Sequence, residues 1–376
     1  MDKEEQPVQL VLDGFHTDSP KKEDGEPAGF GEGTPDPEII TPTHEQWAAL
    51  YKIAMEIRKL SPWKTLWDSD LITIRLPGYD EPFYCSTLGK NGDCYAIAVY
   101  PGYQAFVSYE RLAGARGARA ELIAGCEQIC LICNFGNREE VSPIDREIYK
   151  SLGLKFRGRN ECIFFRSMEP GFAPWYLDAK EADLLIRILK HFSRAYSHMI
   201  KHNLAVDFDN GEILARYYSP DDKLWLNQVE YYPDRTPYAR PAVTITDDPL
   251  IRRLLQKKQN SRYLELDLGF LPIPFRDKTD ARPYTSRLIA LADRQTGISL
   301  DSELVRDGEE TVNGILNMFI SHVTRFGRPS RIYIRNDLAL GYIEDLCGKL
   351  KIKVVEGEGM PALDSFYAEM DKLLDR

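Results

Sequence analysis

Hydrophobic and polar positions follow two different periods along the chain. After Thr43, apolar residues return every three or four positions as far as Leu60, which predicts an amphipathic helix with Thr43 and Gln46 at capping-box spacing. Between Arg262 and Leu268, apolar and polar residues alternate strictly. This alternation predicts a strand with one apolar and one polar face.

The same patterns predict a mixed series of strands and helices before residue 247. Expected elements are strands at 71–76, 82–87, 94–100, 128–135 and 161–166, helices at 103–112, 143–152 and 178–203, and a hairpin over 212–231. Asp178 is predicted to cap the long helix.

The last third is predicted to be more regular. Expected elements are a helix at 249–258, strands at 262–268, 287–292 and 298–305, a helix at 308–326, a strand at 331–335, a helix at 338–350, a strand at 352–355 and a helix at 361–374. We therefore predict a mixed α and β protein, of the α+β or α/β class. It would have two ordered domains, at 43–246 and 247–376.

Residues 1–42 differ in charge from the rest of the chain. They hold 11 acidic and 3 basic residues, a net charge of −8, out of −10 for all 376 residues. With 5 Gly and 6 Pro, this segment cannot bury enough apolar surface to offset its ordering entropy, so we predict a disordered acidic arm. Its short apolar piece at 8–12 could pair weakly with a sheet edge. The body from Thr43 onward carries only −2, so the acidity of the chain does not exclude a polyanionic partner.

Two resemblances add to this picture. Through the segments NFGNREEVSPIDREIYKSLGLKFRGR, RSMEPGFAPWYLDAKEADLL and GRPSRIYIRNDLALGYIEDLCGKLKIKV, the ordered chain resembles bacterial two-domain proteins known only as domains of unknown function. From Arg262 onward, the order of three strands followed by alternating helices and strands resembles the ribonuclease H-like fold of retroviral integrases and transposases. ALADRQTG, FGRPSRIYIRND and KIKVV are similar to the integrase core pattern.

The second resemblance implies a two-metal site made of carboxylates. Paired Mg²⁺ ions would activate the attacking water and stabilise the leaving oxygen. The matching positions are Asp267 on the first strand, Asp337 after the fourth, and Asp364 or Glu369 on the last helix. Each also has a simpler explanation. Asp337 stands where a helix N-cap belongs, Asp267 lies on a polar strand face that we expect to be exposed, and Asp364 suits the first turn of a helix.

Other acidic and basic residues also have both a structural and a functional explanation. Asp293 lies at a turn, which favours Asp for structural reasons. Arg331, Tyr333 and Arg335 share one strand face and could contact phosphates or stacked bases, although an exposed or ion-paired face is the more common arrangement.

Cysteine and histidine spacings offer two further candidates. Cys126, Cys130 and Cys133 have the spacing of an iron–sulfur cluster loop, but their apolar neighbours predict a buried strand with Cys130 and Cys133 on opposite faces. His198 and His202 stand four residues apart on a predicted helix, where surface histidines near a C-terminus are the simpler interpretation. We predict neither a cofactor nor a metal at these sites.

No glycine-rich phosphate loop or nucleophile elbow occurs in the sequence. The acidic N-terminus, the lack of a long apolar stretch and the seven cysteines predict a cytoplasmic protein without a membrane partner. We expect a non-enzymatic binding protein whose partner is more readily a protein than a small molecule, with nucleic acid possible. The alternative is a metal-dependent nuclease or integrase-like enzyme acting through Asp267, Asp337 and Asp364.

Overall fold

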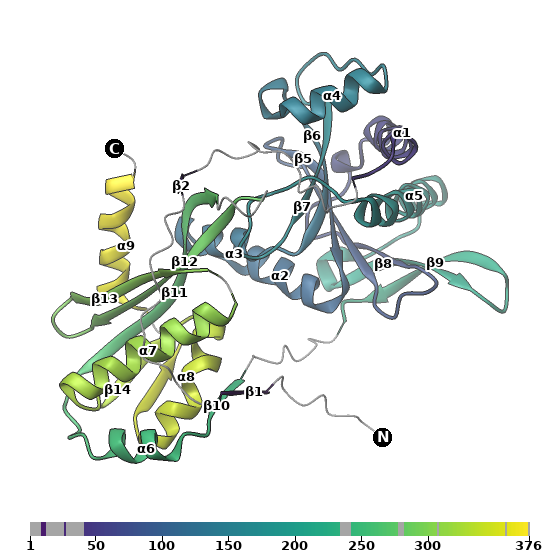
Figure 1. Cartoon of the computed structure of the whole chain (residues 1–376). Helices are drawn as coiled ribbons and strands as arrows, with labels where there is room; N and C mark the ends of the chain where they lie inside the picture. The colour runs from purple at the N-terminus through teal and green to yellow at the C-terminus, as the bar shows by residue number, and fades with distance from the viewer. Residues whose placement is uncertain are drawn as a thin grey trace. The chain divides into compact units, whose positions relative to one another are not determined.

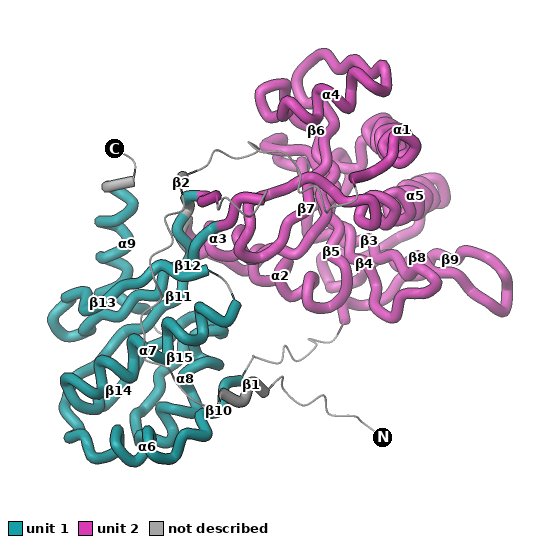
Figure 2. The backbone as a smooth tube through the Cα atoms, viewed as in Figure 1, with its two compact units in different colours: residues 1–24, 237–273, 285–376 teal, residues 25–236, 274–284 magenta. Residues whose placement is uncertain are grey.

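The computed structural model describes residues 9–12, 26–27, 41–233, 242–276, 282–306, 308–357 and 359–374. The chain divides into two compact units (Figure 2). Unit 1 consists of residues 1–24, 237–273 and 285–376, and unit 2 of residues 25–236 and 274–284. The sequence patterns placed a domain boundary at residue 246 and did not indicate that 274–284 group with unit 2.

Most of the predicted acidic arm at 1–42 lies outside the described residues. Two short strands within it are described, β1 (Gln9–Leu12) and β2 (Glu26–Pro27). β1 pairs in parallel with β10 (Ala242–Ile245), so the apolar piece of the arm does join a strand.

Unit 2 is built on a seven-stranded sheet with the order β7-β6-β5-β4-β3-β8-β9 (Figure 1). Neighbouring strands are antiparallel except β3 and β8, which run parallel. The strands are β3 (Ile72–Arg75), β4 (Phe83–Leu88), β5 (Tyr95–Pro101), β6 (Cys130–Gly136), β7 (Cys162–Met168), β8 (Glu212–Ser219) and β9 (Leu224–Tyr231).

Helices cover both faces of this sheet. α1 (His44–Leu60) begins at the capping box of Thr43 and Gln46, and α5 (Ala179–His202) begins at the predicted cap Asp178. Their apolar stripes pack on one face, and α2 (Gly102–Gly114) packs with an aromatic cluster on the other. The remaining helical segments of unit 2 are α3 (Ala118–Cys126), α4 (Pro143–Ser151), η1 (Pro62–Lys64), η2 (Arg138–Glu140) and η3 (Phe208–Asn210).

Unit 1 contains a sheet with the order β13-β12-β11-β14-β15. Its strands are β11 (Tyr263–Arg276), β12 (Tyr284–Asp293), β13 (Ile298–Val305), β14 (Arg331–Ile334) and β15 (Lys353–Glu356). β12 and β13 are antiparallel, and β14 runs parallel to both β11 and β15. Three consecutive strands with two parallel strands added beside the first form the ribonuclease H-like arrangement, so the predicted fold class is confirmed.

Helices also cover both faces of the sheet in unit 1. On the apolar face, α6 (Asp248–Leu255), α7 (Glu309–Phe326) and α8 (Asp337–Lys349) bury the leucines and isoleucines of β11 and β14. On the other face, α9 (Pro361–Leu374) packs through Leu363 and Tyr367 in a cluster that includes Tyr333. The polar face of β11 is therefore covered, which the alternating pattern alone did not predict.

Within the part of the chain that is described, no helix is both long enough and apolar enough to span a bilayer.

Candidate functional site

Two acidic side chains of β11 lie beneath α9. Glu265 is 0% exposed and Asp267 is 1% exposed. The expectation that Asp267 would be exposed is wrong, because α9 covers the strand face on which it lies. Carboxylates buried this deeply need charged or hydrogen-bonding partners.

Arg335 is the partner of Asp267. β14 pairs in parallel with β11, with Ile334 opposite Leu266, so the residue after β14 lies beside Asp267. Arg335 donates to Asp267 Oδ2 from Nε at 3.1 Å and from Nη2 at 2.7 Å. Its Nη1 donates to Asp364 Oδ1 on α9 at 2.5 Å. One guanidinium therefore joins the first-strand and last-helix acids that the sequence analysis singled out.

The charge of Arg335 is secured by these acids. Burial lowers the pKa of its guanidinium, but the charges of Asp267 and Asp364 and their hydrogen bonds more than offset that effect and raise the pKa above its usual range. Arg335 is therefore a permanent cation between two carboxylates.

A second arginine holds the neighbouring acid. Arg294 Nη1 donates to Glu265 Oε1 at 2.9 Å and to the carbonyl oxygen of Gly359 at 2.6 Å. Its guanidinium also lies 4.1 Å from the centre of the Tyr333 ring. The other oxygen of Glu265 accepts the backbone N–H of Leu363 at 2.9 Å. These contacts fix the start of α9 against the sheet.

The other predicted acids have local structural roles. Asn336, and not Asp337, caps α8, because its Oδ1 accepts the backbone N–H groups of Leu338 and Ala339 at 2.9 and 3.1 Å. Asp337 is the first residue of the helix, where a negative charge suits the dipole.

Asp293 supports the turn that the sequence analysis assigned to it. Its Oδ1 accepts the backbone N–H of Gln295 at 3.0 Å and that of Thr296 at 3.1 Å.

These side chains do not fit a two-metal site. A pair of divalent ions needs several carboxylate oxygens as ligands, and Asp267 Oδ2 already accepts two hydrogen bonds from Arg335. Within the described ranges, no three His, Cys, Asp or Glu side chains are grouped so that they could hold an ion. A metal at Asp267 and Asp364 would have to displace a bound cation.

The predicted face of Arg331, Tyr333 and Arg335 is only partly open. Tyr333 is 6% exposed and lies under Arg294, so its ring does not offer a surface for base stacking. The Arg331 guanidinium lies 5.1 Å from the ring centre of Tyr263, and Arg335 is paired with acids.

Two of the three cysteine candidates, Cys130 and Cys133, lie within hydrophobic cores, whereas Cys126 is half-buried at the end of α3. Cys130 and Cys133 of β6 pack into the clusters on opposite faces of the sheet, as the sequence predicted for a buried strand. Burial raises the pKa of the Cys130 thiol to about 12 and that of the Cys133 thiol further still. Neither is a ready metal ligand, because the thiolate is the binding form.

The two histidines near the end of α5 do lie together. The ring centres of His198 and His202 are 4.4 Å apart. Slight burial and the neighbouring His202 lower the pKa of His198. Among the residues that the structure describes, no third His, Cys, Asp or Glu joins them to form a metal site of the usual kind.

Comparison with known families gives two matches. Residues 47–216 match the model described as Domain of unknown function (DUF7309). Residues 250–371 match the model described as Domain of unknown function (DUF6930). Neither description assigns an activity, and no curated protein matches the chain.

Solved structures similar to part of the chain include retroviral integrases. The catalytic core domain of HTLV-2 integrase in complex with magnesium is 16% identical, with a TM-score of 0.23, over 32% of this chain and 73% of that one. An intasome of simian T-cell lymphotropic virus in complex with PP2A regulatory subunit B56 gamma is also 16% identical, with a TM-score of 0.23, over 32% of this chain and 45% of that one. The ribonuclease H-like fold of unit 1 is assigned from its own strand order and not from these matches.

Sequence reasoning missed Glu265 and Arg294. Glu265 lies two residues before Asp267 and therefore on the same strand face, which was the available signal. Arg294 follows a turn, and nothing local indicates that its side chain reaches across to β11.

Proposed function

We propose that the protein is a non-enzymatic binding protein whose ribonuclease H-like unit uses arginines where a nuclease would use metal ions. The single observation that supports this most strongly is Arg335, which donates to Asp267 and Asp364 together. Because the guanidinium is cationic and fixed, it neutralises both acids and repels a second cation from the same place.

A second observation supports the proposal. Glu265 is held by Arg294 and by the backbone of α9, so the whole row of acids on β11 is neutralised or hydrogen-bonded. Opening this row to substrate would leave Glu265 and Asp267 buried without partners, which is strongly unfavourable.

The alternative is a metal-dependent nuclease or integrase-like enzyme. One observation favours it: the fold brings Asp267 and Asp364 to the same guanidinium, so both predicted acids do lie at one site. The two proposals differ in whether Arg335 leaves that site when a divalent ion is present.

A cleavage assay separates the two. End-labelled single- and double-stranded DNA and RNA are incubated with the purified chain and Mg²⁺ or Mn²⁺. We expect no cleavage above a metal-free control. Metal-dependent cleavage that disappears in Asp267→Asn and persists in Glu344→Gln, an exposed control on α8, would overturn the proposal.

The partner of the protein is also a proposal. The expectation of a protein partner is tied to no particular side chain, whereas the charged surface of unit 1 described below favours nucleic acid as the ligand. A cytoplasmic location stays a prediction.

A further inference from the structure

Three connections of unit 1 meet at the amino ends of its parallel strands. They are residues 256–262 before β11, 327–330 before β14 and 350–352 before β15. The Asn260 backbone N–H donates to the Arg328 carbonyl at 2.9 Å, and the Arg328 N–H donates to the Lys258 carbonyl at 3.1 Å. Gln259 Nε2 donates to the Lys351 carbonyl at 3.2 Å. The three connections therefore form one hydrogen-bonded platform.

Gly327 and Arg328 hold this platform together. Gly327 has φ +91°, and a Cβ there would lie 2.5 Å from the Lys258 carbonyl oxygen, so the approach requires glycine. Arg328 donates from Nε to the Lys257 carbonyl at 3.0 Å and from Nη1 to the Leu350 carbonyl at 2.7 Å. Arg328 therefore has a structural role, satisfying carbonyls near the ends of α6 and α8.

Positive charge is concentrated on the platform. The stretches 249–262, 312–334 and 346–355 contain no Asp or Glu and eleven Lys or Arg residues. We call one group of these side chains the basic end: Lys257, Lys258, Arg262, Arg325, Lys351 and Lys353. Of these, Lys258, Arg325, Lys351 and Lys353 are exposed and the other two are half-buried.

The cations of the basic end are not neutralised by neighbouring acids. None of the six makes an ion pair with an acidic residue in the described part of the chain. Of the acids nearby, Asp345 is paired with Lys349, Asp293 is buried in its turn, and Asp301 of β13 forms no ion pair with any of the six cations among the described residues. An array of unpaired exposed cations creates a positive potential that attracts polyanions.

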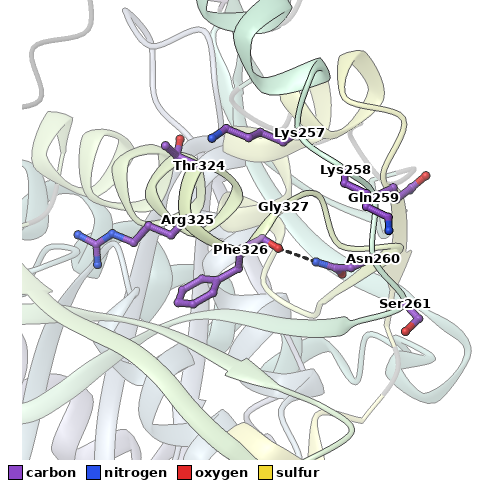
Figure 3. Close-up of a pocket in the computed structure, with 9 residues that line it drawn as sticks. All are labelled: Lys257, Lys258, Gln259, Asn260, Ser261, Thr324, Arg325, Phe326 and Gly327. Carbon is purple, nitrogen blue, oxygen red and sulfur yellow. Dashed lines mark hydrogen bonds between the residues drawn. The ribbon is translucent and has the colours of Figure 1, made fainter.

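An exposed aromatic ring stands among these cations. Phe326, at the end of α7, is 56% exposed, and the Arg262 guanidinium lies 5.5 Å from its ring centre. A surface hollow of about 440 Å³ adjoins it, lined in part by Lys257, Lys258 and Arg325 (Figure 3). Asn260 Nδ2 donates to the Phe326 carbonyl at 3.0 Å, which holds the backbone of Phe326 in place (Figure 3).

We infer that the basic end with Phe326 is a binding surface for single-stranded nucleic acid, with phosphates on the cations and a base on the Phe326 ring. Cations that follow a backbone together with an aromatic platform are the usual means of binding single strands without sequence preference. A duplex keeps its bases stacked inside, so it would leave Phe326 unused. This inference names a ligand for the proposed binding function and does not depend on whether the Arg335 site is catalytic.

The surface is separate from the Arg335 site. Arg331 is the first residue of β14 and Arg335 directly follows its last residue, so the two are four residues apart, which corresponds to roughly 13 Å along a strand. The basic end lies beyond the Arg331 end of the strand. Strand binding can therefore be measured in EDTA, where no metal-dependent cleavage can occur. A lack of binding in EDTA would contradict this inference alone, whereas cleavage in Mg²⁺ would contradict the proposed non-enzymatic function alone.

Fluorescence anisotropy of a labelled single strand about 20 nucleotides long tests the inference, since this length exceeds the site of one small domain. We expect binding by the full chain in EDTA that weakens from about 50 mM to about 200 mM salt. Lys258→Glu with Arg325→Glu should weaken binding about 10-fold or more and reduce the salt slope by about 1.4. Lys52→Glu with Lys59→Glu, an equal charge change on exposed positions of α1, should change affinity less than about 2-fold.

Phe326→Ala separates base stacking from general attraction to polyanions. The ring is exposed, so its removal should leave folding intact and weaken single-strand binding by about 5- to 150-fold. The inference is overturned if the wild-type chain does not bind, if the α1 control loses as much affinity as the basic-end variant, or if duplex DNA or heparin binds as tightly as the single strand. It is also overturned if Phe326→Ala binds as the wild type does.

Discussion

The two ends of the sheet in unit 1 differ in whether their charged side chains are buried and paired or exposed and unpaired. Towards the Arg335 end, the two acidic side chains of β11 are buried and each is held by an arginine, Asp267 by Arg335 and Glu265 by Arg294. At the basic end, cations such as Lys258 and Arg325 are exposed and have no acidic partner among the described residues. Charges that are paired and buried stabilise a fold in one conformation, whereas unpaired exposed charges remain available to a ligand.

Substitution of Arg335 should have the largest effect on stability. Arg335→Ala leaves Asp267 buried without its cation, which should lower the free energy of unfolding of unit 1 by about 3 kcal/mol. Arg335→Lys keeps the charge but loses the planar fork, so it should lower stability less. Denaturant titration followed by circular dichroism measures both. Equal stability of Arg335→Ala and the wild type would show that the pair does not hold the domain together.

Substitution of Gly327, in the platform under the basic end, should have the next largest effect on stability. Gly327→Ala introduces a Cβ at positive φ and close to the Lys258 carbonyl, which should lower the free energy of unfolding by about 1–3 kcal/mol and weaken single-strand binding. Gly348→Ala is the matched control, because a Cβ there meets no neighbouring atom and the residue lies within α8. That control should be neutral or slightly stabilising. Equal loss in the two variants would contradict the close approach of the connections.

A buried histidine beside the basic end predicts a pH dependence. Burial and then the charge of Arg262 lower the pKa of His322, and Asp293 and Asp301 oppose this only in part. Because the unfolded chain binds this proton more readily, His322 contributes stability that is lost as the pH falls below about 6.5. His322→Gln should therefore show a smaller decrease in melting temperature between neutral and acidic pH. An unchanged slope would mean that His322 does not titrate differently on folding.

Asp364 should contribute least. Its side chain is 51% exposed, so its bond to Arg335 is screened by water. Asp364→Asn should change the free energy of unfolding by about 1 kcal/mol or less. Asp267→Asn, measured in parallel, should be clearly more destabilising, because Arg335 would then face a neutral group. Similar losses in the two variants would contradict the division into a buried and an exposed acid.

The sequence predicted the fold of unit 1 better than its surfaces. Strict alternation in 262–268 identified the strand and its two faces, and the order of elements indicated the ribonuclease H-like arrangement. Alternation does not say what covers the polar face, so Asp267 was expected to be exposed although α9 buries it. Whether a polar face is covered depends on contacts between residues that are far apart in the chain.

Long-range contacts explain the other differences as well. The sequence suggests Arg335 as a binding residue because it shares a strand face with Arg331 and Tyr333, yet its partners Asp267 and Asp364 lie 68 and 29 residues away in the chain. The basic end consists of three acid-free stretches that are visible in the sequence. Their joint surface arises only when parallel pairing of β11, β14 and β15 brings the three connections together.

Binding and cleavage can be separated on one sample by two gels. A labelled single strand is incubated with the chain in Mg²⁺, and the same sample is run on a native gel for binding and on a denaturing gel for strand length. We predict a shifted strand of unchanged length, with the shift lost in Lys258→Glu with Arg325→Glu and retained in Asp267→Asn. A strand that is shortened by the wild type and left intact by Asp267→Asn, or one that never shifts, would contradict the account.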